Sequence, residues 1–201
     1  MDTVLLVEVF VTLFVIMDPV GTVPIFLSLT AGQSTEYARR AAWQAVAVSF
    51  LVISIFAFFG QQILTYLHIS LPAMQGAGGL LLLLVALELL TGNEQEQTAV
   101  VGTNVAMVPL GTPLLAGPGA IVATMLFVKR INGAADAIAF SAALVAVGII
   151  LWLFLRYCNL VVRVLRPSGV ELLTRVSGLL VSAIAVQLIA GSVEAFAHGA
   201  H

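Results

Sequence analysis

The sequence predicts an all-α membrane protein with six transmembrane helices, arranged as a 3+3 inverted repeat. Three observations predict this fold class. The 201 residues are 61% hydrophobic and 9% charged, with a mean hydropathy of +1.12, whereas soluble domains carry about 25% charged residues. The apolar residues form segments long enough to cross a bilayer, which takes about 20 helical residues. The two halves of the chain also resemble each other at a constant offset.

Short polar links separate six apolar segments, and each segment is predicted to span the membrane as one helix. They cover approximately residues 3–29, 41–67, 71–91, 105–128, 134–157 and 172–197. Ser34 and Ser70 are predicted N-caps of the second and third helices. The chain is therefore interpreted as a single transmembrane domain, with one repeat in 1–92, a loop at 93–104 and the second repeat in 105–201.

An offset of 99 residues relates the two halves. It pairs Pro19 with Pro118, Gly79 with Gly178, Gly92 with Gly191, and Glu88 with Gln187. Shared prolines and glycines are more informative than Leu or Val matches in so apolar a chain. Because each unit has three crossings, the second enters the membrane upside down, an arrangement typical of secondary transporters.

Both repeats contain helix-breaking residues inside an apolar segment. The motif Asp-Pro-x-Gly-x-x-Pro occupies residues 18–24, and three prolines and three glycines occur between 109 and 119. Irregular backbone at membrane depth is tolerated only where protein or a watery cavity satisfies its polar groups. Helices 1 and 4 are therefore predicted to break near the midplane and to face each other across one cavity.

The predicted substrate-binding residues are Asp18, Pro19, Val20, Gly21, Thr22, Gly117, Pro118, Gly119, Ala120 and Gln187. Amides that follow the two breaks would present N–H groups at a positive helix end, which suits a carboxylate. Asp18 and unpaired carbonyl groups suit an ammonium or a proton, so a small zwitterion fits both. A leucine in place of Gly119 is expected to fill this cavity and spare membrane insertion.

Asp18 and Glu88 are the predicted coupling residues, because ionisable groups inside a membrane usually serve function. Simpler interpretations stand beside these. Asp18 could only cap its own helix, Glu88 could lie at the interface, and Gln187 could bond a neighbouring helix. Gly79 and Gly178 are interpreted as close-packing positions. His198 and His201 lack a nearby carboxylate or thiol, so no metal or cofactor is expected.

The basic residues predict the orientation, because cytoplasmic ends are enriched in Lys and Arg. Six arginines fall on one side of a six-helix protein, namely Arg39, Arg40, Arg156, Arg163, Arg166 and Arg175. Lys129 and Arg130 fall on the other side, together with both termini. The N- and C-termini are therefore predicted to lie outside. Net charge is −2, so nucleic acid is not an expected partner.

Three motifs resemble the MarC family of bacterial and archaeal membrane proteins. They are Asp-Pro-x-Gly-x-x-Pro-x-Phe at 18–26, Pro-Leu-Gly-Thr-Pro-Leu-Leu-Ala-Gly-Pro-Gly-Ala-Ile at 109–121, and Thr-Arg-Val-Ser-Gly-Leu-Leu with Ala-Ile-Ala-Val-Gln at 174–187. The resemblance covers essentially the whole chain. It implies six helices, a place in the lysine-exporter superfamily, the cytoplasmic (inner) membrane, and carriage of small neutral amino acids such as glycine and alanine.

The function predicted is a secondary transporter of small neutral amino acids or similar polar metabolites, coupled to protons through Asp18. No nucleotide-binding loop of the G-x-x-x-x-G-K-S/T type occurs. The alternatives are an intramembrane enzyme or a non-transporting membrane subunit. A thiol carrier would need paired cysteines, and Cys158 stands alone. The expected partners are a small-molecule substrate and the lipid bilayer, and a homo-oligomer is compatible with both.

Overall fold

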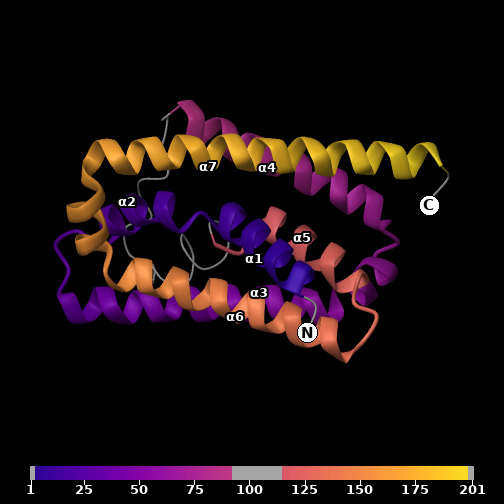
Figure 1. The fold of residues 1–201 in the computed structure, drawn as a ribbon, viewed down its shortest axis with the longest axis horizontal. Helices are drawn as coiled ribbons and strands as arrows, with labels where there is room; N and C mark the ends of the chain where they lie inside the picture. Colours follow the sequence, from indigo (N-terminus) through magenta and orange to yellow (C-terminus); the bar gives the residue numbers. More distant parts are fainter. Residues whose placement is uncertain (1–2, 92–114, 199–201) are drawn as a thin grey trace.

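The computed structural model describes residues 3–91 and 115–198, and all regular elements in those ranges are helices. They are α1 (Thr3–Met17), α2 (Pro19–Leu29), α3 (Thr35–Tyr66), α4 (Leu71–Thr91), α5 (Pro118–Lys129), α6 (Ala134–Arg156) and α7 (Cys158–Ala197). Helices α4 and α7 lie side by side along one edge of the bundle (Figure 1), and α1, α2, α3, α5 and α6 form the rest. A prediction of an all-α protein is confirmed for the described residues.

Five helical stretches are long and apolar enough to cross a membrane: Thr3–Leu29, Thr35–Tyr66, Leu71–Thr91, Ala134–Arg156 and Ser168–Ala197. They correspond to five of the six predicted segments. The remaining segment is represented by the shorter apolar helix Pro118–Lys129, because residues 92–114 lie outside the described residues. The protein is therefore a multi-pass membrane protein.

The ends of two helices follow the predicted capping chemistry. The Ser34 hydroxyl accepts a hydrogen bond from the Tyr37 N–H at 3.1 Å, and the Ser70 hydroxyl accepts one from the Ala73 N–H at 3.3 Å. Helix α3 begins at Thr35, directly after its predicted cap, so the helix starts six residues before the apolar segment that begins at about residue 41. At about 48 Å for 32 residues, α3 exceeds the roughly 30 Å hydrocarbon core.

Glycines bring α4 and α7 together, as predicted. A Cβ at Gly79 would lie 3.0 Å from the Ala185 carbonyl oxygen, and one at Gly178 would lie 3.3 Å from the Ala86 carbonyl oxygen. Small residues of this kind allow helix backbones to approach closely in a membrane. The Ser192 hydroxyl also donates to the Pro72 carbonyl oxygen at 2.7 Å, so the pair is tied by polar and apolar contacts.

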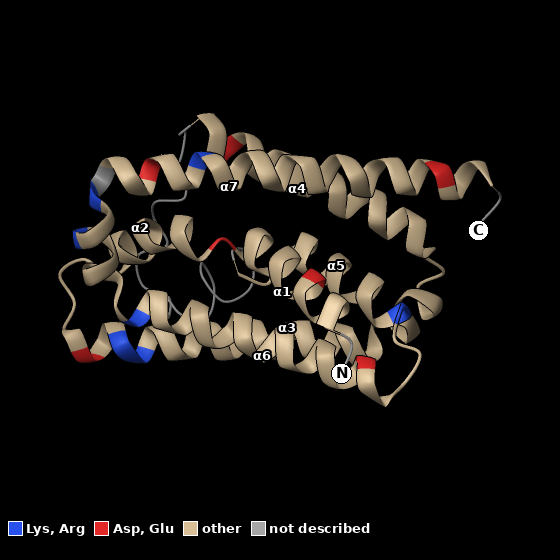
Figure 2. Ribbon diagram, in the orientation of Figure 1, with Lys and Arg blue, Asp and Glu red and all other residues tan. Residues whose placement is uncertain are grey.

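The basic residues separate along the long axis of the bundle. Figure 2 shows most of them toward the end that holds the start of α3 and the link between α6 and α7, and basic residues also where α5 ends, at the opposite end. The start of α1 and the end of α7 lie at the opposite end (Figure 1), where α5 also ends. The arginine-rich links and the two ends of the described chain therefore lie at opposite ends of the helical bundle. Which of these ends is cytoplasmic stays a prediction.

A reporter fusion tests this orientation. We expect a periplasmic reporter fused after His201 to be active and a cytoplasmic reporter at the same place to be silent, because the arginine-rich side is held inside. Matched fusions in the link between α6 and α7 should give the reverse pattern. Activity of the cytoplasmic reporter after His201 would contradict the charge argument.

Candidate functional site

The candidate site is the break between α1 and α2. Helix α1 ends at Met17 and α2 begins at Pro19, while Asp18 between them has left-handed backbone angles of φ 38° and ψ 73°. The 15 residues of α1 reach about 22 Å, so α1 alone is too short to cross a hydrocarbon core of roughly 30 Å. The break lies inside the apolar stretch Thr3–Leu29, which is long enough to cross a membrane, and Asp18 is only 8% exposed.

Thr22 satisfies part of the backbone at the break. Its hydroxyl donates to the Asp18 carbonyl oxygen at 2.7 Å and lies 3.3 Å from the Met17 carbonyl oxygen. The Thr22 N–H also donates to the Asp18 carbonyl oxygen at 3.0 Å. Side chains of Ser and Thr commonly take up carbonyl groups that a broken membrane helix releases. Two of the carbonyl groups predicted to face a substrate are thus already engaged by the protein.

The Asp18 carboxylate does not cap α2. Its position is that of an N-cap, with Pro19 as the first helical residue, yet its side chain makes no hydrogen bond to the described amides of the first turn of α2. The carboxylate instead lies over Gly21, where a Cβ would collide with its Oδ2 atom. Gly21 is therefore needed because it leaves room for the carboxylate in its observed position. Capping alone does not explain the aspartate.

Thr174 of α7 completes this wall of the site and was missed by sequence reasoning. It is 7% exposed, and its methyl carbon would lie 3.5 Å from a Cβ at Gly21. Helices α2 and α7 pack together, so a threonine from a distant part of the sequence lies next to Gly21. In the sequence, the only indication that Thr174 belongs to the site was its place in the motif at 174–187.

The second predicted break is described from residue 115 onward. Gly117 precedes α5 with extended angles of φ −63° and ψ 166°, and Pro118 is the first helical residue. Leu115, Ala116 and Ala120 belong to the same buried cluster as Met17, so the end of α1 and the start of α5 share one core. The residues 109–114 of the predicted break lie outside the described residues.

Gly119 packs against α4. A Cβ there would collide with the side chain of Leu82, and Gly119 and Ala120 are both buried. On α4, Gly78 faces Val122 and the Pro118 carbonyl group in the same way. A leucine at 119 was expected to fill a substrate cavity and to spare membrane insertion. The contact with Leu82 predicts instead that it disturbs the packing of α4 against α5.

We accordingly expect Gly119→Leu to destabilise the protein by about 1–3 kcal/mol, the usual cost of overpacking a tight core. Thermal unfolding in detergent, read by size-exclusion chromatography, measures the loss. Leu82→Ala in the same chain should restore part of the stability, because it vacates the space that the new side chain enters. If Gly119→Leu lost transport but kept its melting temperature, Gly119 would line the substrate cavity instead of serving helix packing.

The structure does not bring Glu88 and Gln187 to Asp18. Both side chains are exposed on the outer faces of α4 and α7. Gln187 lies thirteen residues beyond Thr174, about 20 Å further along α7. Their predicted roles in binding and coupling therefore have no support from the geometry, while Asp18, Pro19, Gly21 and Thr22 lie together at one break.

A buried threonine on α5 was also missed. Thr124 is fully buried, and its hydroxyl has no hydrogen-bond partner among the described residues. Most buried polar side chains have such a partner. Sequence reasoning had no signal for it, because a single threonine inside an apolar helix usually bonds its own backbone.

Comparison with known proteins agrees with this membrane architecture. The family model described as "MarC family integral membrane protein" matches residues 3–196. A UPF0056 membrane protein of Methanocaldococcus jannaschii is 34% identical over 96% of this chain and 98% of its own length. The UPF0056 membrane protein YhcE of Escherichia coli is 31% identical over 92% of this chain and 90% of its own length. No solved structure matches significantly.

Proposed function

The chain belongs to the MarC family of integral membrane proteins, and we propose that it is a secondary transporter of small neutral amino acids or similarly small polar metabolites. The observation that carries this proposal is the buried Asp18 carboxylate at a helix break within the membrane. Such a carboxylate is costly in hydrocarbon and usually marks a substrate or proton pathway.

The residues around the break support a small, polar substrate. Gly21 leaves room for the Asp18 carboxylate, and Thr174 of α7 packs beside Gly21. Asp18 would bind an ammonium group, and N–H groups of the first turns of α2 and α5 would bind a carboxylate. The proposal assigns binding, orientation and proton exchange to these residues, and no covalent chemistry.

Alternating access would come from an inverted repeat. The starts of α2 and α3 at residues 19 and 35 precede the starts of α5 and α6 at 118 and 134 by the same 99 residues that relate the two halves of the sequence. This agreement supports two equivalent units of opposite orientation, with the first helix of each unit broken. Rocking of one unit against the other would expose Asp18 to each side in turn.

Counterflow in proteoliposomes tests the proposal. Vesicles preloaded with unlabelled glycine or alanine should take up the same labelled amino acid transiently above the level of empty vesicles, without any nucleotide. Leucine, lysine and glutamate provide the matched panel for size and charge. Absence of counterflow for every small neutral amino acid by folded protein would contradict the proposed function.

A further inference from the structure

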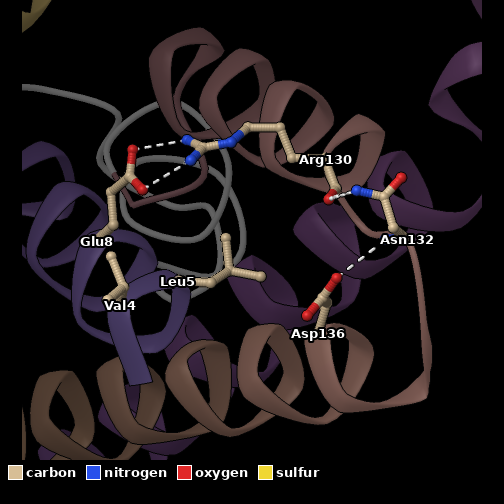
Figure 3. A pocket seen from close by; sticks show the side chains of 6 residues that line it. All are labelled: Val4, Leu5, Glu8, Arg130, Asn132 and Asp136. Atoms are coloured by element: carbon tan, nitrogen blue, oxygen red, sulfur yellow. Dashed lines mark hydrogen bonds and ion pairs between the residues drawn. The ribbon is translucent and has the colours of Figure 1, made fainter. Parts of the chain in front are cut away.

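A second polar pocket lies between the start of α1 and the end of α5. Its volume is about 310 Å³, and it is lined by Val4, Leu5, Glu8, Arg130, Asn132 and Asp136. Figure 3 shows these side chains around one hollow, with contributions from α1, the link between α5 and α6, and the first turn of α6. Glu8 precedes Asp18 by ten residues, about 15 Å along α1, so this pocket is separate from the break.

The pocket contains a two-pronged ion pair (Figure 3). Arg130 donates from Nη1 to Glu8 Oε1 at 2.6 Å and from Nη2 to Glu8 Oε2 at 2.9 Å. The two side chains are 55% and 41% exposed. Ion pairs this exposed are weak, because water screens both partners. The pair can therefore open at little cost when a ligand offers each charge a new partner.

The rest of the pocket is ordered by local hydrogen bonds. The Asn132 N–H donates to Asp136 Oδ2 at 3.1 Å, and its side-chain amide donates to the Arg130 carbonyl oxygen at 3.1 Å. Arg130 also lies over the Phe127 ring, 5.7 Å from its centroid. These contacts fix the guanidinium at the end of α5, while Val4 and Leu5 provide a small apolar wall.

We propose that this pocket binds a small zwitterion, which inserts between Glu8 and Arg130. The carboxylate of the ligand takes the place of Glu8 on the Arg130 guanidinium, and its ammonium group binds the released Glu8 carboxylate. Both charges of the protein stay paired, and the net charge of the pocket does not change. A singly charged solute would replace only one partner of the Glu8–Arg130 ion pair, whereas a zwitterion replaces both, so the pocket favours solutes that carry both charges.

This assignment rests on the proposed function for its substrate class and adds a second binding position to it. The ion pair joins the start of α1 to the end of α5, and the other ends of these helices adjoin Asp18 and Gly117. A ligand that opens the pair removes this direct link between the two helices.

Protection of a single thiol tests the pocket without requiring transport. Val4→Cys in a Cys158→Ser chain places a reactive thiol at the pocket, because Val4 is 73% exposed. Glycine should slow alkylation of this thiol in proteoliposomes. Acetate and methylammonium, each with one of the two charges, should protect less than glycine at the same concentration, since each lacks one charged partner. Equal protection by acetate, or none by glycine, would overturn the proposal.

Matched variants separate the ion pair from general charge. Glu8→Gln and Arg130→Gln should each remove protection by glycine, whereas Glu8→Arg combined with Arg130→Glu should keep it, because a zwitterion can bind in the opposite direction. Glu194→Gln removes an exposed carboxylate of α7 outside the pocket and should change nothing. If the folded double variant Glu8→Arg, Arg130→Glu lost protection by glycine, that result would contradict insertion of the zwitterion between the two side chains.

Counterflow measured on the same vesicles distinguishes the two proposals. Counterflow of glycine without protection of the thiol would contradict the surface pocket and leave the transporter intact. Protection of the thiol without counterflow of glycine or alanine would contradict the transporter and support the pocket as a binding site in its own right.

Discussion

Asp18→Asn is expected to abolish accumulation of glycine or alanine driven by a pH gradient, while the protein stays folded. Asparagine has the same size and, like aspartate, tolerates the left-handed backbone found at this position. It cannot exchange a proton. With one proton per solute, a gradient of 1 pH unit can support about tenfold accumulation, and the variant should reach about equal concentrations on both sides. Labelled solute in proteoliposomes measures the ratio.

Asp18→Gly provides the control for backbone conformation. Glycine adopts left-handed angles freely but carries no carboxylate, so it should lose accumulation as asparagine does. If Asp18→Asn still exchanges substrate, the carboxylate serves only to couple transport to protons. If the folded variant no longer exchanges substrate, the carboxylate binds the amine of the substrate. Accumulation equal to that of the parent would show that Asp18 has no part in coupling.

Gly21→Ala is expected to have the second largest effect. A methyl group at this position would collide with the Asp18 carboxylate and come within 3.5 Å of the Thr174 methyl carbon. The carboxylate must then leave its observed place. We expect counterflow to fall by about tenfold or more, since displacement of a binding group by about 1 Å can reduce a rate by about 10²-fold.

Gly148→Ala is the matched control for this change. Gly148 also lies inside a helix, but a Cβ there would meet only Phe50 at an ordinary 3.7 Å. Alanine should stabilise α6 slightly and leave counterflow unchanged. If Gly21→Ala and Gly148→Ala both kept the counterflow of the parent protein, Gly21 would not be needed to make room for the carboxylate.

Local chemistry explains what the sequence could predict. Asp-Pro and Gly-Pro each favour a helix start, because proline has no N–H to lose at the first helical position. Helices α2 and α5 begin at Pro19 and Pro118. The paired starts at an offset of 99 residues follow from the same signals. Ser34 and Ser70 could be predicted as helix starts because a serine N-cap bonds an amide only three residues away.

The remaining features depend on contacts between distant residues. The position of Leu82 against Gly119, of Thr174 near Asp18, and of Arg130 on Glu8 follows from how helices pack, and sequence spacing does not encode it. Arg166 is a local exception of another kind. Its backbone angles of φ 59° and ψ 162° divide α7 inside the link predicted between the segments 134–157 and 172–197, although the left-handed angle at an arginine was not predicted.

In the proposed transporter, a solute and a proton cross the membrane together through the break at Asp18. A pH-sensitive dye trapped inside proteoliposomes measures this directly when glycine is added with no imposed gradient. Addition of glycine should change the internal pH in the parent protein and leave it constant in Asp18→Asn. Labelled glycine that enters vesicles of the parent protein at constant internal pH would contradict the claim.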